Sequence, residues 1–444
     1  MEGKKQFTWQ ELIKLNQWHN AHVAYKGKVY DISGFIKRHP GGQEQIMLAA
    51  GRDMTQLFHS YHKQHVADLI EKKCKYVGDL VSDEMPTFLM EDGKFYQTLN
   101  RRVSNYFKSN GLDPKVDILT FCRYTLFCFL SLFLWYVCLA LYTTSPLMSV
   151  IVATISGLFT ALVAMTVGHD GNHYAITHKP WIWTLCFFCS GSITGYSSLS
   201  WRYQHTYGHH MFTNIDGADP DIHTALKGPD VRRIKPRQSW FPTYRIQHLY
   251  MPIVYPLLVF KMKFEDFHTF YVMKKATIRI NPLTMFQSLM FVGEKALHFL
   301  IRFILPYLFF PLSSVLLLNV TADVVTGLWQ AFISQITHVN SMVEWPNKEK
   351  KYNKPWAEMQ VATTVDFATN SWFWSMITGT VNHQVAHHLF PGVLQTYYPY
   401  ITPIVQQTCA EFGLNYNSQP TVWDALLLHF GYLNIMGINP NLKE

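Results

Sequence analysis

Two uncharged apolar runs constrain the fold more than any other feature of the sequence. They cover residues 124–143 and 147–168, with a turn at Ser145 and Pro146 between them. A helix needs about 20 mostly apolar residues to cross the hydrocarbon core of a membrane. Each run therefore predicts a transmembrane helix, and the short turn predicts that the two helices form a hairpin.

A second apolar pair lies downstream and predicts two further spans. It covers residues 292–311, with Arg302 inside, and residues 312–335, with Asp323 inside. We therefore expect four transmembrane helices. Residues 181–200 are also apolar but rich in Gly, Ser and Trp. We expect that segment to lie at the membrane interface or to re-enter it.

Composition and charge narrow the class of protein. Charged residues are 15% of the 444, against about 25% in soluble domains. This composition excludes a disordered chain and argues against an ordinary soluble enzyme. The net charge is +8, and basic residues are frequent in residues 202–280. The positive-inside rule places that segment in the cytoplasm. Its scattered charge beside membrane spans predicts no nucleic-acid partner.

The first part of the chain has a different character. Residues 6–85 predict a small soluble α+β domain, with a hairpin turn at Lys26-Gly27. Residues 86–116 are polar and helical in pattern, and predict a linker and a helix that approaches the membrane. Residues 117–444 then form an all-α membrane domain with a cytosolic helical cap.

Two histidines of the first domain have the pattern of a heme site. His39 begins the sequence His-Pro-Gly-Gly, and His62 follows further along. Two imidazoles can ligate heme iron from opposite faces and leave no open position, so that such a site moves electrons. His59 and His65 are alternatives to His62.

Three histidine clusters accompany the membrane segments. They are His169-Asp-Gly-Asn-His173, His205-Thr-Tyr-Gly-His209-His210 and Gln384-Val-Ala-His387-His388. Residues i and i+4 share one face of a helix, so His169 and His173 can face one metal, as can His205 and His209. Adjacent helical residues point about 100° apart. His209 and His210 could therefore serve two neighbouring ions. Imidazole suits iron, copper and zinc, which leaves the metal open.

The predicted topology brings the clusters together. Two crossings precede the first cluster, and two more precede the third. All three clusters then lie on the cytosolic side with the N-terminal domain, and we expect one shared polynuclear metal site. His338 ends the fourth run on the same side and is a further candidate ligand. His178 and His383 stay open as residues that support the ligands or as structural residues.

The N-terminal motifs resemble a cytochrome b5 domain over its whole length. They are Val29-Tyr30-Asp31-Ile32, His39-Pro40-Gly41-Gly42 and Gly51-Arg52-Asp53. The resemblance implies that His39 and His62 are the axial ligands of heme b.

A fused cytochrome b5 domain with three histidine boxes resembles a front-end fatty acid desaturase of the endoplasmic reticulum. The most telling residue is Gln384, where membrane desaturases more generally have a histidine. The resemblance implies a diiron centre, with no catalytic residue beyond its ligands. These would be His169, His173, His205, His209, His210, His338, Gln384, His387 and His388. Ala386 replaces the usual Glu of the last box, and we expect no lost chemistry.

Finer motifs resemble the Δ5 desaturases of fungi and protists. They lie at residues 208–214, 217–221, 231–236 and 356–361, whereas 169–173 and 382–384 resemble some protist Δ4 enzymes. The resemblance implies an oxygen-dependent cis double bond between an existing one and the carboxyl end, at carbon 5 of C20 polyunsaturated chains. The alternatives are Δ4, Δ6 or Δ8 insertion and, more distantly, a sphingolipid-base desaturase or hydroxylase. A membrane-tethered electron carrier is disfavoured because all three boxes are complete.

The same resemblance implies the partners and the location. The substrates would be O₂ and a long-chain acyl-CoA or acyl-phospholipid in the membrane lipid. NADH-cytochrome b5 reductase would donate the electrons. The protein would be multi-pass in the endoplasmic reticulum membrane, with its N-terminus, heme domain, histidine boxes and C-terminus cytosolic.

Overall fold

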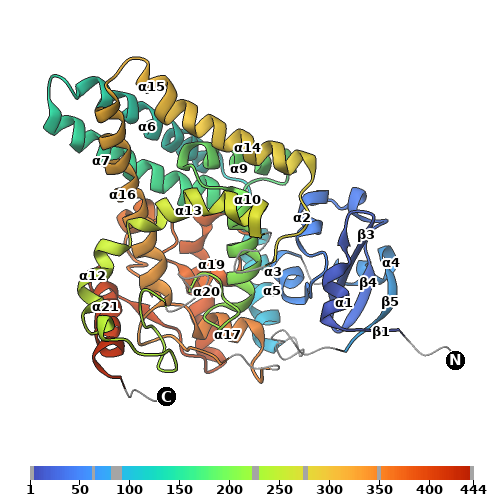
Figure 1. Cartoon of the computed structure of the whole chain (residues 1–444). Coiled ribbons are helices and arrows are strands. Elements are labelled where there is room, and N and C mark those ends of the chain that lie inside the picture. The colour runs from blue at the N-terminus through green and yellow to red at the C-terminus, as the bar shows by residue number, and fades with distance from the viewer. Residues whose placement is uncertain are drawn as a thin grey trace.

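An N-terminal α+β domain packs beside a larger helical body (Figure 1). The computed structural model describes residues 5–62, 66–81, 93–222, 230–273, 279–347 and 352–440. The predicted fold class of a small α+β domain followed by a helical domain is confirmed. His65, one alternative heme ligand, lies outside the described residues.

A five-stranded sheet forms the N-terminal domain, in the order β1-β5-β4-β3-β2. Its strands are β1 (Gln6–Phe7), β2 (Asn16–Gln17), β3 (Asn20–Tyr25), β4 (Lys28–Asp31) and β5 (Lys75–Leu80). Lys26 and Gly27 join β3 to β4 with φ of 49° and 74°. A two-residue hairpin of type I′ needs positive φ at both positions, which explains the glycine.

Short helices complete this domain and carry its histidines. They are α1 (Trp9–Lys14), the 3₁₀ helix η1 (Ile36–Arg38), α2 (Gln43–Leu48), α3 (Thr55–Tyr61) and α4 (Asp68–Lys73). A capping box between Thr8 and Glu11 begins α1. His39 directly follows η1, and His62 directly follows α3.

The helix predicted in the linker is α5 (Lys94–Ser109). It buries Phe95, Leu99, Val103 and Phe107, a spacing of four that places one apolar stripe on one face. That stripe packs on α20 (Tyr398–Glu411). Helix α5, which precedes the membrane domain in sequence, therefore packs against α20 near the C-terminal end of that domain.

Three helices of the described residues are long and apolar enough to cross a membrane. They are α6 (Ile118–Leu141), the continuous helix Pro146–Asn172 and α16 (Leu312–His338). The second consists of α7 (Pro146–Val163), the π-helical turn η3 (Ala164–Gly168) and α8 (His169–Asn172). Helix α7 packs against both α6 and α16.

The predicted count of four spans is not confirmed. The proposed third span, 292–311, falls in α14 (Met285–Phe299), the π-helix η7 (Leu300–Ile304) and α15 (Leu305–Tyr307). This stretch buries Lys295 and Arg302. Lys295 pairs with Asp266 at 2.7 Å, and Arg302 Nε donates to Asn319 at 2.9 Å. Ionisable side chains inside a membrane-spanning segment are costly unless other residues of the protein pair with them.

The segment 181–200 also differs from a span. It forms α9 (Pro180–Thr194) and α10 (Ser198–Trp201), and α9 packs against α14. The 15 residues of α9 rise about 22 Å. This is less than the roughly 30 Å hydrocarbon core of a bilayer.

The remaining elements form a cap at one end of the long helices (Figure 1). They are the π-helix η4 (Arg202–His209), α11 (His210–Phe212), η5 (Pro242–Ile246), α12 (Gln247–Val254), α13 (Leu257–Phe267), η6 (His268–Met273), α17 (Trp356–Ala362), α18 (Trp372–Ile377), α19 (Gln384–Leu389), η8 (Gln395–Tyr397), α20, α21 (Val422–Ile438), and the parallel pair β6 (Asp366–Phe367) and β7 (Ser418–Gln419). The second and third histidine clusters lie in this cap.

Candidate heme and metal sites

The N-terminal domain holds His39 and His62 opposite each other. Their ring centroids are 6.1 Å apart. His39 Nδ1 lies 2.9 Å from the Gly42 carbonyl, and His62 Nδ1 lies 3.1 Å from the Phe58 carbonyl. When each Nδ1–H donates to its carbonyl, each Nε2 is left for a metal. Burial lowers the pKa of His62 to about 4, so its imidazole is neutral as ligation requires.

The alternative ligand His59 is engaged elsewhere. Its Nε2 lies 3.3 Å from the hydroxyl of Tyr25, and the two rings are also in contact. His62 instead stacks on Phe58 with ring centroids 4.3 Å apart. This geometry favours His62 over His59 as the partner of His39.

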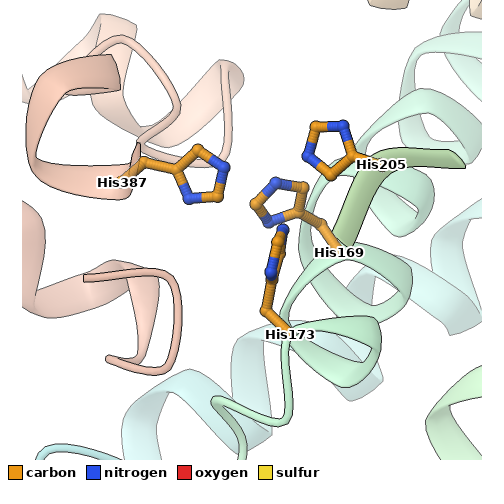
Figure 2. A group of neighbouring side chains, drawn as sticks. All are labelled: His169, His173, His205 and His387. Atoms are coloured by element: carbon orange, nitrogen blue, oxygen red, sulfur yellow. The ribbon is translucent and has the colours of Figure 1, made fainter. Parts of the chain in front are cut away.

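The three histidine clusters converge at the cap end of the long helices. Figure 2 shows His169 and His173 on one helix, with His205 and His387 directed toward them from two other segments. One ligand atom from each of these four lies within 4.8 Å of the others. Helices of distant sequence thus build one nitrogen-lined centre.

A second group lies beside the first. His209, His338 and His388 form it, and His210, His387 and His388 form a bridging set, each with its ligand atoms within 4.8 Å. The bridging set shares His387 with the first group and His388 with the second, so the two groups are adjacent. Each group can hold one ion, and the centre can therefore hold two neighbouring ions. The structure thus brings all eight predicted histidines together.

The second box brings its histidines together in more than one way. One ligand atom of His205 and one of His209 lie within 4.8 Å of each other and of Asp221. His205 Nε2 also lies 3.2 Å from His210 Nε2, and His209 Nε2 lies 3.3 Å from His338 Nε2. The contact between His205 and His210 follows from the π-helix Arg202–His209, in which residues i and i+5 align.

Unpartnered buried atoms show that the centre fits metal ions. Four of its atoms are buried without a hydrogen-bond partner in the part of the chain that the structure describes: His173 Nε2, His387 Nε2, His388 Nε2 and Gln384 Oε1. Buried polar atoms normally have a partner, and such a cluster of acceptors is what metal coordination satisfies. The Gln384 amide also lies 2.8 Å from His338 Nε2. Burial lowers the pKa of His387 and His388 well below the ordinary value, which keeps both neutral.

Polar residues hold the imidazoles from behind. Asp221 accepts from His205 Nδ1 at 2.9 Å, and Asp219 accepts from His209 Nδ1 at 3.0 Å. Gln360 Oε1 lies 2.8 Å from His388 Nδ1. Such contacts fix the tautomer and orientation of a metal-binding histidine, so that Nε2 faces the metal. These partners had no assigned role in the sequence, although they lie in segments 217–221 and 356–361, which carry the resemblance.

Three further contacts come from more distant elements. Gln395 Nε2 lies 2.6 Å from His169 Nδ1, and the Tyr398 hydroxyl lies 3.2 Å from His387 Nδ1. The Tyr61 hydroxyl of the N-terminal domain lies 2.8 Å from His173 Nδ1. No local pattern identifies these three residues, because only the folded chain brings them to the histidines.

Two histidines left open in the sequence lie away from the metal centre. His178 is exposed and pairs with Asp113 at 2.9 Å. His383 contacts the Thr402 hydroxyl at 2.9 Å through Nδ1 and the Ser375 hydroxyl at 3.4 Å through Nε2. Both ring nitrogens of His383 are therefore engaged, and its position is structural.

A cavity of about 400 Å³ opens on the metal centre. His169, His205, His209, His338 and Gln384 line one part of it. Apolar side chains of α12, α13 and α16 line much of the rest, among them Met251, Val254, Leu258 and Ile333. The cavity can therefore place an apolar chain against the metal-facing nitrogens.

A domain with a heme-site pattern, beside a histidine centre for two metal ions at the end of membrane-length helices, defines a membrane oxidoreductase with its own electron-transfer module. Comparison with known proteins places residues 144–420 in "Fatty acid desaturase" and residues 8–81 in "Cytochrome b5-like Heme/Steroid binding domain". The chain belongs to the fatty acid desaturase family, as a front-end acyl desaturase fused to a cytochrome b5-like domain. The predicted desaturase activity, O₂ dependence, heme and diiron centre are thereby confirmed.

Its relatives match along nearly the whole chain. An acyl-lipid (8-3)-desaturase of Mortierella alpina is 40% identical over 98% of both chains. The acyl-lipid (8-3)-desaturase of Physcomitrium patens is 37% identical over 98% of this chain and 92% of its own. Delta(5) fatty acid desaturase A of Dictyostelium discoideum is 35% identical over 98% of this chain and 95% of its own.

Proposed function

We propose that this chain inserts a cis double bond at carbon 5 of a C20 polyunsaturated acyl chain, between an existing bond and the carboxyl end. The observation that carries the proposal is the full-length similarity to relatives named (8-3)- and Delta(5)-desaturases. The Δ4 alternative rests on residues 169–173 and 382–384 alone.

We also propose the nine residues predicted from the sequence as the diiron ligands, and His39 and His62 as those of the heme. When bound, the two iron ions supply the O₂-dependent oxidation that an unactivated C–H bond requires. The reaction consumes one O₂, two electrons and two protons, and yields the double bond and two waters. The protein holds the imidazoles neutral and oriented, and its apolar cavity keeps bulk water from the reacting carbons.

A buried arginine supports binding of the carboxyl end close to the metals. Arg232 lines the cavity and is 1% exposed. Its Nη1 donates to Gln335, whereas Nε and Nη2 have no hydrogen-bond partner among the described residues. Leaving a buried donor unpaired costs about 1–3 kcal/mol, so a substrate oxygen would stabilise this site.

The position of Arg232 explains a bond near the carboxyl end. Its partner Gln335 lies one turn before His338 on α16. Side chains three residues apart on a helix lie about 5–6 Å apart. A carbonyl or phosphate oxygen held by Arg232 would thus place the first carbons of the acyl chain, rather than its middle, beside the metals.

The cellular setting is proposed from the same family relationship. NADH-cytochrome b5 reductase would reduce the heme domain, and the carrier would be acyl-CoA or a phospholipid. The protein would lie in the endoplasmic reticulum membrane, with both termini, the heme domain and the histidine boxes cytosolic. We propose domain bounds of 6–85 and 117–444, joined by residues 86–116.

Expression in yeast tests the regiochemistry. Cells fed separately with acids suited to Δ4, Δ5, Δ6 or Δ8 insertion would be analysed by mass spectrometry that locates double bonds. A new bond at carbon 5 of a C20 acid is expected, and a bond at carbon 4, 6 or 8 would replace the Δ5 assignment. A product that gains oxygen would indicate a hydroxylase.

The same cells test the arginine. Arg232→Gln should lower conversion about 10- to 150-fold, since a hydrogen bond to a charged group contributes about 1.5–3 kcal/mol. Unchanged conversion with unchanged product would remove Arg232 from the substrate site.

A further inference from the structure

The heme domain reaches the metal centre through one side chain. Tyr61 ends α3 and directly precedes His62, the proposed heme ligand. Its hydroxyl lies 2.8 Å from Nδ1 of His173 in the first histidine box. One hydrogen bond and the backbone between two adjacent residues therefore connect the two sites.

Independent contacts hold the heme domain in this position. Arg52 lies over the rings of Tyr203 and Tyr207, at 5.3 and 4.9 Å from their centroids, on the π-helix of the second box. Asn281 Nδ2 donates to the Met47 carbonyl at 2.7 Å. Because these contacts dock the domain without Tyr61, its hydroxyl is not needed for docking alone.

The third histidine box also accommodates Tyr61. A Cβ on Gly392, just after that box, would come within 3.2 Å of Cδ1 of the Tyr61 ring. That separation is tighter than most Cβ contacts, so a glycine here leaves more room for the Tyr61 ring. Tyr61 thus lies against the first box and against the segment that follows the third box.

We propose that Tyr61 is the positioning residue that couples the heme to the metal centre, by holding His173 through its Nδ1 and joining it to His62. Each transfer oxidises the heme iron by one electron and reduces the metal centre by one. The phenol keeps its hydrogen and is not itself oxidised. The proposal rests on the assignment of His62 and His173 as ligands.

Tyr61→Phe tests this role, because it removes the hydroxyl and keeps the ring. Tyr96→Phe is the matched control. The Tyr96 hydroxyl bridges the Leu389 carbonyl at 3.2 Å and the His59 carbonyl at 3.5 Å, at the same interface. Among the described residues, the Tyr96 hydroxyl bonds only to these two backbone carbonyls and to no side chain of a proposed ligand.

Three measurements on the purified full-length protein separate the outcomes. The heme absorbance spectrum and the iron content report the ligands. Hydrogen exchange of the α3 amides reports docking. The rate at which prereduced heme is reoxidised, after mixing with O₂ and acyl substrate, reports transfer.

We expect both variants to retain heme and α3 protection, and the rate is taken per bound iron because losing a hydrogen bond to a metal ligand also weakens metal binding. The rate of heme reoxidation per bound iron should fall about tenfold or more in Tyr61→Phe, which is the usual effect of removing a residue that hydrogen-bonds to a metal ligand. The rate should stay unchanged in Tyr96→Phe. A normal rate per bound iron in Tyr61→Phe would overturn the proposal, as would equal slowing in both variants. Absence of heme or iron from the unmodified protein would instead contradict the ligand assignment.

Discussion

At the scale of single residues, the metal centre depends on groups that never touch the metal. Asp221 accepts from both His205 Nδ1 at 2.9 Å and Gln204 Nε2 at 2.8 Å. It therefore fixes which ring nitrogen of His205 faces the ions. Losing such a partner typically costs 10- to 100-fold in metal affinity or activity.

Asp221→Asn should consequently lower iron affinity about 10- to 100-fold. The iron content per chain, measured at increasing concentrations of a chelator, would report this loss of affinity. Asp216→Asn is the control, because Asp216 pairs with Lys235 in the same region. If the two variants retained iron equally well, Asp221 would have no role in orienting His205.

The sequence alone could identify only those site residues that form a motif with near neighbours in the chain. His169 and His173 are four apart, and the paired histidines stand together in the sequence. Gln384 was found only through the family resemblance. Tyr61 could not be found, because 112 residues separate it from His173.

At the scale of elements, close helix packing positions the first box. On α7, Gly157 faces α16, and a Cβ there would collide with the Ala322 carbonyl. The Thr326 hydroxyl also donates to the Gly157 carbonyl at 2.9 Å. Small residues allow such approaches between membrane helices.

Gly157→Ala should destabilise the protein by about 1–3 kcal/mol, the usual cost of overpacking. Thermal unfolding in detergent would measure the change. Gly431→Ala, on α21, is the control, since no other described segment comes within 4 Å of its added Cβ. Equal stability of the two variants would mean that α7 and α16 can separate at no cost.

The number of spans is open to direct measurement. The end of the α14–α15 stretch packs with α6, since Phe310 and Phe303 join the cluster around Trp135 and Leu139. Tyr136 also donates to the Ile301 carbonyl at 3.1 Å. We therefore expect this stretch to cross with α6, as a fourth span.

Glycosylation acceptor loops inserted at residues 142–145 and 308–311 should both be modified in the lumen. A loop inserted at Gly413 should stay unmodified. Modification at 142–145 but not at 308–311 would leave three spans. The sequence could predict the apolar pairs from length, but not the π-helices η3, η4 and η7, which depend on tertiary packing.

At the scale of the whole molecule, the heme domain and the metal centre form one electron-transfer unit. Sequence motifs predicted both sites and placed them on one side of the membrane. The contact between them depends on tertiary docking through Arg52, Asn281 and Tyr61. No periodicity or motif encodes such an interface, because its partners come from distant segments.

One measurement tests the central claim most directly: single turnover of the purified, chemically reduced protein with O₂ and a C20 polyunsaturated acyl substrate, without added reductase. The account predicts a product two hydrogens lighter, with its new bond at carbon 5, formed together with reoxidation of the heme. It would be contradicted if the heme were reoxidised at the same rate in protein stripped of its non-heme iron. An oxygenated product, or an unchanged substrate in protein that holds both heme and iron, would contradict it equally.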